Sequence, residues 1–213
     1  ESLLQIRGLK KRFSLSGDFL EQLRFKGGKL VRHQEFIHAI NGVNLDIKRG
    51  EALCVVGESG CGKSTVARTV MGLISPSEGE IRYDGQRIDD LSSKQLLPYR
   101  KRMQMIFQNP YASLNPRMTI GAALEEAVGQ RLSSDGPTVQ ELLEEVGMAA
   151  EDAHRLPGSF SGGQRQRIVL ARALALAPQF LVLDESVAAL DLRIQAEILD
   201  LLLELCQQRG LTF

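Results

Sequence analysis

The chain has 213 residues, of which 43% are hydrophobic and 24% are charged. These are ordinary values for a globular protein, and they exclude a disordered, collagen-like or coiled-coil chain. Basic and acidic residues number 26 each, so no net charge favours wrapping by nucleic acid. Residues 1–50 carry ten basic and five acidic side chains, which we interpret as a solvated basic edge.

The cysteines and the apolar stretches indicate the cellular environment of the chain. Cys54, Cys61 and Cys206 are far apart and odd in number, which favours a reducing compartment over a disulfide framework or a metal site. Cys54 lies in an apolar run and is predicted to be a small core residue. No apolar stretch reaches the roughly 18 residues of a membrane span, and no signal peptide is visible. Because residue 1 is Glu rather than Met, we expect that the chain has been trimmed.

Apolar patterning over residues 1–90 predicts mainly β structure. Strands are expected at residues 3–9, 36–47, 52–56, 81–83 and 86–88, the last two joined by a turn at Asp84-Gly85. The run 52–56 is typical of a strand buried on both faces. The polar stretch 16–35 predicts a loop or an excursion from a sheet. A helix is expected over residues 63–71, ended by Gly72.

The second half of the chain predicts alternating helices and strands. Helices are expected at residues 119–130, 137–147, 161–177 and 192–209, and strands at residues 103–107 and 180–183. Pro137 suits a helix start, and Gly210 a helix stop. Residues 211–213 look like the start of another strand, so we expect the natural chain to continue. The order predicts an α/β fold with antiparallel strands, a parallel α/β core and an inserted helical lobe.

A glycine-rich segment before the helix expected at residues 63–71 fits the phosphate-binding pattern G-x-x-x-x-G-K-[ST]. It consists of Gly57, Glu58, Ser59, Gly60, Cys61, Gly62, Lys63, Ser64 and Thr65. Its glycines let backbone N–H groups converge on phosphate oxygens, and the helix start adds partial positive charge. Lys63 would serve the β- and γ-phosphates, and the Ser64 hydroxyl suits Mg²⁺. The segment predicts binding of a nucleoside triphosphate but does not separate a kinase, GTPase, helicase or transporter motor.

Two acidic residues follow the apolar run at residues 180–183. Asp184 stands where a P-loop protein needs a carboxylate to hold Mg²⁺, and Glu185 could act as general base on an attacking water. Alone, the pair could equally cap a turn. With the phosphate loop upstream, we predict a metal-binding and a catalytic carboxylate.

A third motif starts the helix expected at residues 161–177. Ser161 and Gln164 form an S-x-x-Q capping box, which could start a helix for purely local reasons. The order and spacing indicate more. One constellation emerges in chain order: the phosphate loop, Gln108 after a strand, this helix start, and then Asp184.

With this constellation the sequence resembles the ATP-binding subunits of ATP-binding cassette (ABC) transporters, from about residue 3 to residue 213. The segment MIFQNPYASLNP and the pairing of GESGCGKST with FSGGQRQR resemble the oligopeptide, dipeptide and nickel importer branch in particular. The resemblance implies one ABC ATPase domain over residues 1–213, truncated at its C-terminal end. Residues 1–109 and 161–213 would form the nucleotide-binding core with an antiparallel β subdomain, and residues 110–160 a helical signature subdomain.

The resemblance also implies residue roles. Gln108 would touch Mg²⁺ and the attacking water, and flex as the helical subdomain turns. The signature residues would bind the γ-phosphate of ATP held by a second subunit: Ser161, Gly162, Gly163 and Gln164. Asp191 would lie in a loop crossing the dimer interface, and it is equally suited to be a plain helix cap. The catalytic set would be Lys63, Gln108 and Glu185, and the metal set Ser64, Gln108 and Asp184.

Three positions are less regular. His38 falls where the family usually has an aromatic residue that stacks on adenine; Phe36 is a rival, and a surface histidine is the alternative. Ser186 stands where the family commonly has proline, which we interpret as tolerated variation. The family's switch histidine follows the last helix, and the chain stops at Phe213, before that position. We therefore expect this chain to bind MgATP but to hydrolyse it weakly.

The implied function is that of an ATPase motor subunit of an importer for peptides or a related small solute such as nickel. It would act at the cytoplasmic face of the cell membrane, with ATP and Mg²⁺. Implied partners are a second ABC ATPase subunit, transmembrane permease subunits and, indirectly, an extracytoplasmic solute-binding protein, but no nucleic acid. The basic N-terminal stretch could lie toward anionic lipid. The alternatives are a non-transport ABC-type ATPase acting on DNA or ribosomes, and a small P-loop kinase.

Overall fold

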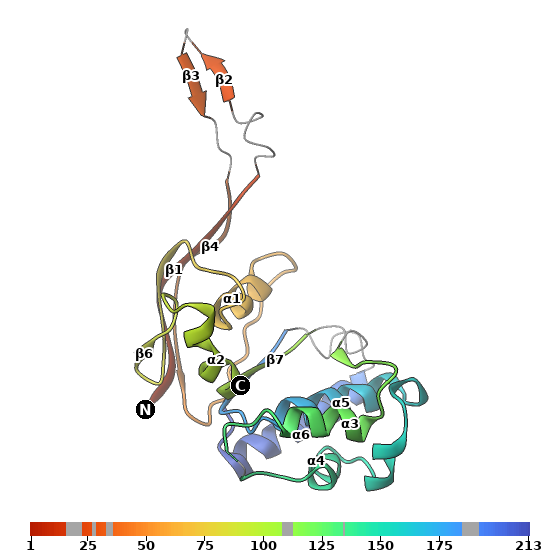
Figure 1. The fold of residues 1–213 in the computed structure, drawn as a ribbon. Coiled ribbons are helices and arrows are strands. Elements are labelled where there is room, and N and C mark those ends of the chain that lie inside the picture. The colour runs from red at the N-terminus through yellow and green to blue at the C-terminus, as the bar shows by residue number, and fades with distance from the viewer. Residues whose placement is uncertain (16–22, 27–28, 33–35, 108–112, 134, 185–191) are drawn as a thin grey trace. The chain divides into compact units, whose positions relative to one another are not determined.

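A computed structural model describes residues 1–15, 23–26, 29–32, 36–107, 113–133, 135–184 and 192–213. The chain divides into two compact units, and Figure 1 labels most of their helices and strands. The β unit comprises residues 2–46 and 55–90, and the helical unit comprises residue 1 with residues 47–54 and 91–213.

The β unit is built on a four-stranded sheet in the order β4-β1-β5-β6. Its strands are β1 (Ser2–Ser14), β4 (Phe36–Lys48), β5 (Glu78–Tyr83) and β6 (Gln86–Arg87). β1 and β5 are antiparallel and pair Leu4 with Tyr83 and Ile6 with Ile81. All four side chains are buried, so alternate residues of these strands build the inner face of the sheet. The predicted antiparallel β structure is confirmed.

The turn between β5 and β6 is the hairpin that the sequence predicts. Asp84 and Gly85 have φ angles of 53° and 75°. A two-residue type I′ turn requires this left-handed conformation at both positions, and Asp-Gly is one of the dipeptides that tolerate it. The turn places Tyr83 opposite Gln86.

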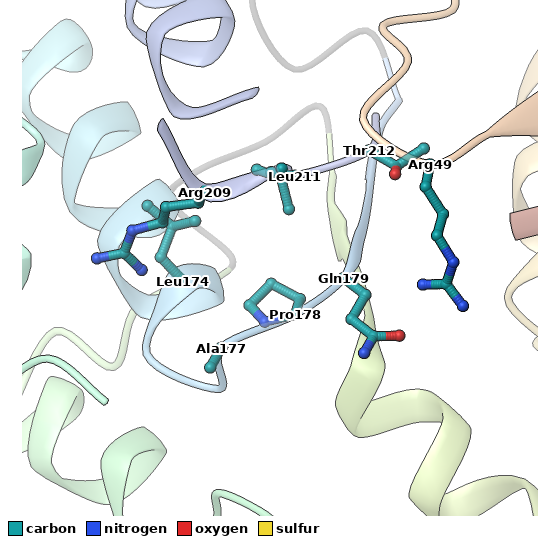
Figure 2. Close-up of a pocket in the computed structure, with 9 residues that line it drawn as sticks. Arg49, Leu174, Ala177, Pro178, Gln179, Arg209, Leu211 and Thr212 are labelled. Carbon is teal, nitrogen blue, oxygen red and sulfur yellow. The ribbon is translucent and has the colours of Figure 1, made fainter. Parts of the chain in front are cut away.

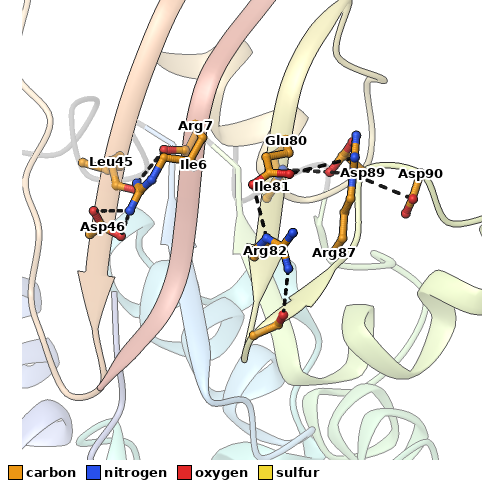
Figure 3. A network of polar contacts seen from close by, with 11 residues as sticks. Ile6, Arg7, Leu45, Asp46, Glu80, Ile81, Arg82, Arg87, Asp89 and Asp90 are labelled. Carbon is orange, nitrogen blue, oxygen red and sulfur yellow. Dashed lines mark hydrogen bonds and ion pairs between the residues drawn. The ribbon is translucent and has the colours of Figure 1, made fainter.

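Polar contacts join the strands of this sheet (Figure 3). Arg7 on β1 donates to both carboxylate oxygens of Asp46 on β4, at 2.7 and 2.8 Å. Asp89, just after β6, accepts from Arg87 at 2.8 Å and from the amide of Ile81 at 2.7 Å. The Arg7 pair is exposed and contributes little. The Asp89 side chain is only 5% exposed, so its contacts fix the end of the hairpin against β5.

A second hairpin lies in the sequence between β1 and β4. β2 (Leu23–Lys26) and β3 (Lys29–Arg32) pair antiparallel, with Phe25 opposite Leu30 and Lys26 opposite Lys29. From the sequence we expect either a loop or an excursion from a sheet at residues 16–35. The β2–β3 pairing supports the excursion. The Gly27-Gly28 dipeptide is the turn signal in the sequence.

The helical unit contains the parallel strands. β7 (Met103–Ile106) and β8 (Phe180–Leu183) pair in parallel. Residues 211–213 lie beside β8, because Thr212 forms a parallel bridge with Phe180. On the other side, the Leu53 amide donates to the Phe213 carbonyl at 2.7 Å, and the Phe213 amide donates to the Glu51 carbonyl at 3.0 Å. This alternation is that of a parallel ladder, so the parallel core is confirmed.

The strand predicted at residues 52–56 forms only at its beginning. Leu53 is paired, but Cys54, Val55 and Val56 are exposed, Val56 by 85%. A strand buried on both faces needs partners along its whole length. Among the described residues, ladder contacts reach only residues 51–53. The prediction that Cys54 is a core residue is therefore wrong.

Five helices and two 3₁₀ turns belong to the helical unit in the described ranges. They are α2 (Ser93–Arg102), α3 (Ile120–Val128), α4 (Val139–Glu145), η2 (Ala150–His154), η3 (Pro157–Ser159), α5 (Gly162–Leu174) and α6 (Leu192–Arg209). Their core includes Leu124, Leu142, Ile168 and Leu202, each at most 1% exposed. Among the described residues, none of the helices has the length and hydrophobicity of a membrane span.

Two helix starts differ from expectation. α2 was not predicted; Ser92 and Gln95 form its capping box, and Pro98 inside the helix weakens its sequence pattern. α4 begins after Thr138, not at Pro137, because Thr138 forms a capping box with Glu141.

α3 and α4 lie within residues 110–160, where the sequence predicts a separate helical subdomain. The boundaries of that subdomain stay a prediction.

Candidate functional site

The phosphate loop belongs to the β unit and runs into α1 (Lys63–Val70). Gly62 stands at the N-cap with φ 102°, and no side-chain hydrogen bond caps the helix. Gly60 is also left-handed, with φ 82°. The first turn of α1 is therefore not capped by a side chain, and a helix start of this kind can donate its amides to an anion.

Gly62 is held against β4. A Cβ at this position would lie 2.3 Å from the carbonyl oxygen of Ala39. Only glycine lets the loop pass the strand this closely. His38 and Phe36 precede Ala39 on β4, and both are exposed. They lie two residues apart and share a face of the strand, so the adenine-stacking role stays a prediction for either one.

Lys63 is folded back over the loop. Its Nζ donates to the carbonyl oxygens of Gly57 and Glu58, each at 2.8 Å. A Cβ on Gly57 would lie 2.9 Å from Cys61 Sγ, so the loop is closely packed on itself. Phosphate oxygens are stronger, charged acceptors than these carbonyls. Lys63 is thus positioned to exchange them for a phosphate group.

Asp184 belongs to the helical unit and follows β8 directly. Its amide donates to the carbonyl of Ile106 at 3.0 Å, a bond that closes the last pair of the β7–β8 ladder, Ile106 with Leu183. Asp184 is 8% exposed. Ligands of open α/β sheets bind at this carboxyl edge of the strands. Gln108, Glu185 and Asp191 lie outside the described residues.

The start of α5 has the predicted capping box. Ser161 Oγ accepts from the Gln164 amide at 3.3 Å, and Gln164 Oε1 accepts from the Ser161 amide at 3.0 Å. Of the four amides that a helix start leaves without an intrahelical acceptor, the box satisfies two. The amides of Gly162 and Gly163 remain to face a ligand.

Gly163 also brings α5 against α6. A Cβ at Gly163 would lie 2.7 Å from Ile194 Cγ2, on the first turn of α6. Glycine is therefore required here for close helix packing as well as for an open helix start. Sequence reasoning missed Ile194, and it missed the Ala39 carbonyl beside Gly62. Nothing local in the sequence marks either contact, because both join segments far apart in the chain.

A cavity of about 370 Å³ in the helical unit lies elsewhere. Figure 2 shows Pro178 and Gln179, which precede β8, across from Leu211, with Arg49 and Arg209 farther out on opposite sides. These residues are at the amino end of β8, whereas Asp184 follows its carboxyl end. The cavity is therefore not part of the predicted nucleotide site.

Comparisons with known proteins agree with these features. Residues 40–188 match the family described as ABC transporter. The glutathione import ATP-binding protein GsiA of Salmonella typhimurium is 43% identical over the whole chain, which covers 33% of GsiA. The oligopeptide transport ATP-binding protein OppF of Bacillus subtilis is 42% identical over the whole chain, which covers 66% of OppF. The chain thus spans between about a third and two thirds of the length of these relatives.

Solved structures give the same result. A dimeric, post-hydrolysis structure of the ATP-binding cassette MJ0796, bound to ADP and Pi, has a TM-score of 0.76 and 27% identity, covering 98% of this chain and 84% of that one. The structure of cbiO1 from Clostridium perfringens, part of the transporter complex cbiONQ, has a TM-score of 0.78 and 27% identity, covering 99% and 76%. Together with the phosphate loop and the capped helix start of α5, these matches show that the chain belongs to the ABC transporter family, as one of its ATP-binding cassettes.

Proposed function

We propose that this chain is the ATP-binding and ATP-hydrolysing motor of an importer for peptides or a related small solute such as nickel. The observation that carries the proposal is the pair of glycine-bearing helix starts. α1 offers uncapped amides beside Lys63, and α5 offers the amides of Gly162 and Gly163. The names of GsiA and OppF, which refer to glutathione import and oligopeptide transport, support the choice of solute class.

The β unit would hold the nucleotide. The amides at the start of α1 and the Lys63 ammonium would bind the β- and γ-phosphates, and His38 or Phe36 would stack on adenine. The oxygen groups of Ser64, Asp184 and Gln108 are of the kind that Mg²⁺ prefers, and Asp184 is buried at a strand end. Mg²⁺ bound there would neutralise charge on the phosphates.

Hydrolysis would use Glu185 and Gln108. Glu185 takes a proton from a water molecule that Gln108 orients, and the water oxygen bonds to the γ-phosphorus. The bond from that phosphorus to the bridging oxygen breaks, which leaves ADP and phosphate. Lys63 and the α5 amides of a second cassette would stabilise the negative charge that shifts in this step.

The motor would work as a pair at the cytoplasmic face of the membrane. Two cassettes, identical or related, would enclose two ATP molecules, each between the phosphate loop of one and residues Ser161–Gly163 of the other. Closure would act on permease subunits that receive solute from an extracytoplasmic binding protein, and hydrolysis would reopen the pair. The family's dimeric cassette structures support this arrangement.

The proposal is tested by light scattering of a Glu185→Gln variant. Removal of the base should trap ATP, so the variant should be dimeric with MgATP and monomeric without it. Adding Lys63→Ala should abolish the dimer. A variant that binds ATP and stays monomeric at every concentration would contradict the paired motor. Copurification of the protein with nucleic acid rather than with membrane subunits would instead favour a non-transport ABC ATPase.

A further inference from the structure

Arg167, a side chain of α5, hydrogen-bonds to both α4 and α6. The residue lies one turn inside α5, four positions after Gly163. Its side chain is 21% exposed. NH1 donates to the carbonyl of Val146 at 2.9 Å, and NH2 donates to Glu197 Oε2 at 3.1 Å. One guanidinium therefore joins α5 to the end of α4 and to the second turn of α6.

The contact with α4 is built for a cation. Val146 is the C-cap residue of α4, where the last carbonyls carry partial negative charge. Gly147 follows with φ 71°, and a Cβ there would lie 3.1 Å from Arg167 NH1. Glycine at 147 thus both ends α4 and leaves room for the guanidinium.

The contact with α6 lies one turn from the contact between Gly163 and Ile194. Residues 163 and 167 are four apart on α5, and residues 194 and 197 are three apart on α6, so both pairs lie along one seam. Arg193 reaches the other oxygen of Glu197, at 3.3 Å, from within α6. It is 89% exposed and does not join two helices. Replacing Arg193 is therefore a matched control, because it removes one positive charge beside Glu197 without removing a contact between helices.

We propose that Arg167 is a positioning residue for the start of α5: by joining α4, α5 and α6 it fixes where residues Ser161–Gly163 are presented to the ATP of a second cassette. This inference rests on the proposed paired motor. Arg167 touches no nucleotide in it. A lysine has one compact ammonium group instead of a planar fork, so it should not reproduce the geometry in which separate guanidinium nitrogens reach Val146 and Glu197.

The test exploits the fact that the phosphate loop and the α5 start of one chain serve different sites. All chains carry Glu185→Gln and one of two affinity tags, so that mixed pairs formed in MgATP are isolated by both tags. The reference pair joins a Lys63→Ala chain to an otherwise unaltered one and keeps one complete site. In the trans pair, one chain carries Lys63→Ala and the other carries Arg167→Met. In the cis pair, one chain carries both changes and the other is otherwise unaltered. Retained ATP is counted per pair.

The trans pair should retain as much ATP as the reference, because its altered α5 faces the site already lost. The cis pair should retain less by about tenfold or more, since small misplacements of a positioned group have effects of that size. Arg167→Lys should behave like Arg167→Met, and Arg193→Gln like the reference. Equal retention in the cis pair and the reference, or equal loss in the cis and trans pairs, would overturn the inference. A reference pair that never forms would instead contradict the paired motor itself.

Discussion

The starts of α1 and α5, where we propose that phosphate is bound, differ in their local design. At α1, a left-handed glycine occupies the N-cap, no side chain caps the helix, and the preceding loop packs on itself where Gly57 meets Cys61. At α5, Ser161 and Gln164 cap each other and leave two glycine amides at the surface. An uncapped start surrounded by its own loop suits a nucleotide of the same chain. A capped, self-supporting start suits contact with a ligand carried by another molecule.

The largest predicted effect is at Gly62. Gly62→Ala places a Cβ against the Ala39 carbonyl in a left-handed backbone, so we expect loss of ATP binding and a free energy of unfolding lower by about 3 kcal/mol or more. Gly60→Ala is the matched control, because it is left-handed with open space around it and should cost only about 1 kcal/mol. Nucleotide titration and urea unfolding measure both. Equal effects would show that the contact with β4 is unimportant.

Gly163→Ala should have the next largest effect. The added methyl group meets Ile194 Cγ2, and overpacking of this kind costs about 1–3 kcal/mol. ATP binding by the chain should persist, while pairing of the Glu185→Gln variant with MgATP should be lost. Adding Ile194→Ala should restore pairing in part, and Ile194→Val should not, because valine keeps the Cγ2 methyl group that the added Cβ would meet. Loss of ATP binding by Gly163→Ala would remove the distinction between the two helix starts.

Ser161→Ala should act more weakly. It removes the acceptor for the Gln164 amide, and loss of an N-cap typically costs about 1 kcal/mol. Urea unfolding should report this cost, with ATP affinity unchanged. Ser161→Asn, which can still cap, should be close to neutral for stability. If the two variants were equally destabilised, the capping box would not support the start of α5.

The smallest effects concern pH, and they should have opposite sign in the two units. In the helical unit, burial raises the pKa of Glu145 more than Arg209 lowers it, so its stabilising contribution is lost as pH rises through that pKa. In the β unit, burial raises the pKa of Asp89, but hydrogen bonds from Arg87 and the Ile81 amide outweigh it. The pKa lies below its ordinary 3.8, and this contribution is lost as pH falls through it.

Thermal unfolding as a function of pH measures both groups. Glu145→Gln should flatten the fall in stability between the ordinary glutamate pKa of 4.5 and the raised pKa of Glu145. Asp89→Asn should flatten the loss of stability at acid pH, below the ordinary aspartate pKa of 3.8. The same sign of change for both variants would contradict the assignment of these shifts to burial at Glu145 and to hydrogen bonding at Asp89.

Local signals in the sequence predicted much of the fold. Asp84-Gly85 specified a hairpin, Ser161 and Gln164 a helix start, and Gly210 the end of α6, because each acts through its own neighbours. The helix α2 was missed since Pro98 interrupts its pattern. The run at residues 52–56 was misjudged because burial depends on partner segments, and among the described residues these reach only Leu53.

For the candidate site, as for the fold, the sequence predicted the local features but not the contacts between distant segments. The residue types of the phosphate loop, Asp184 and the α5 start followed from motifs with a physical basis. The contacts that position them did not, because Gly62 with Ala39, Gly163 with Ile194 and Arg167 with Val146 join segments distant in the chain. One sequence contains no signal for such pairs. The roles of Gln108 and Glu185 stay predictions, since both lie outside the described residues.

The most direct test of the account is amide hydrogen exchange of the Glu185→Gln variant with MgATP, at protein concentrations below and above pairing. Amides of residues 57–65 should be protected by ATP at both concentrations. Amides of Gly162 and Gly163 should become protected only above the pairing concentration. Protection of these two amides in the monomer, or its absence in the pair, would contradict the claim that the two helix starts serve different molecules.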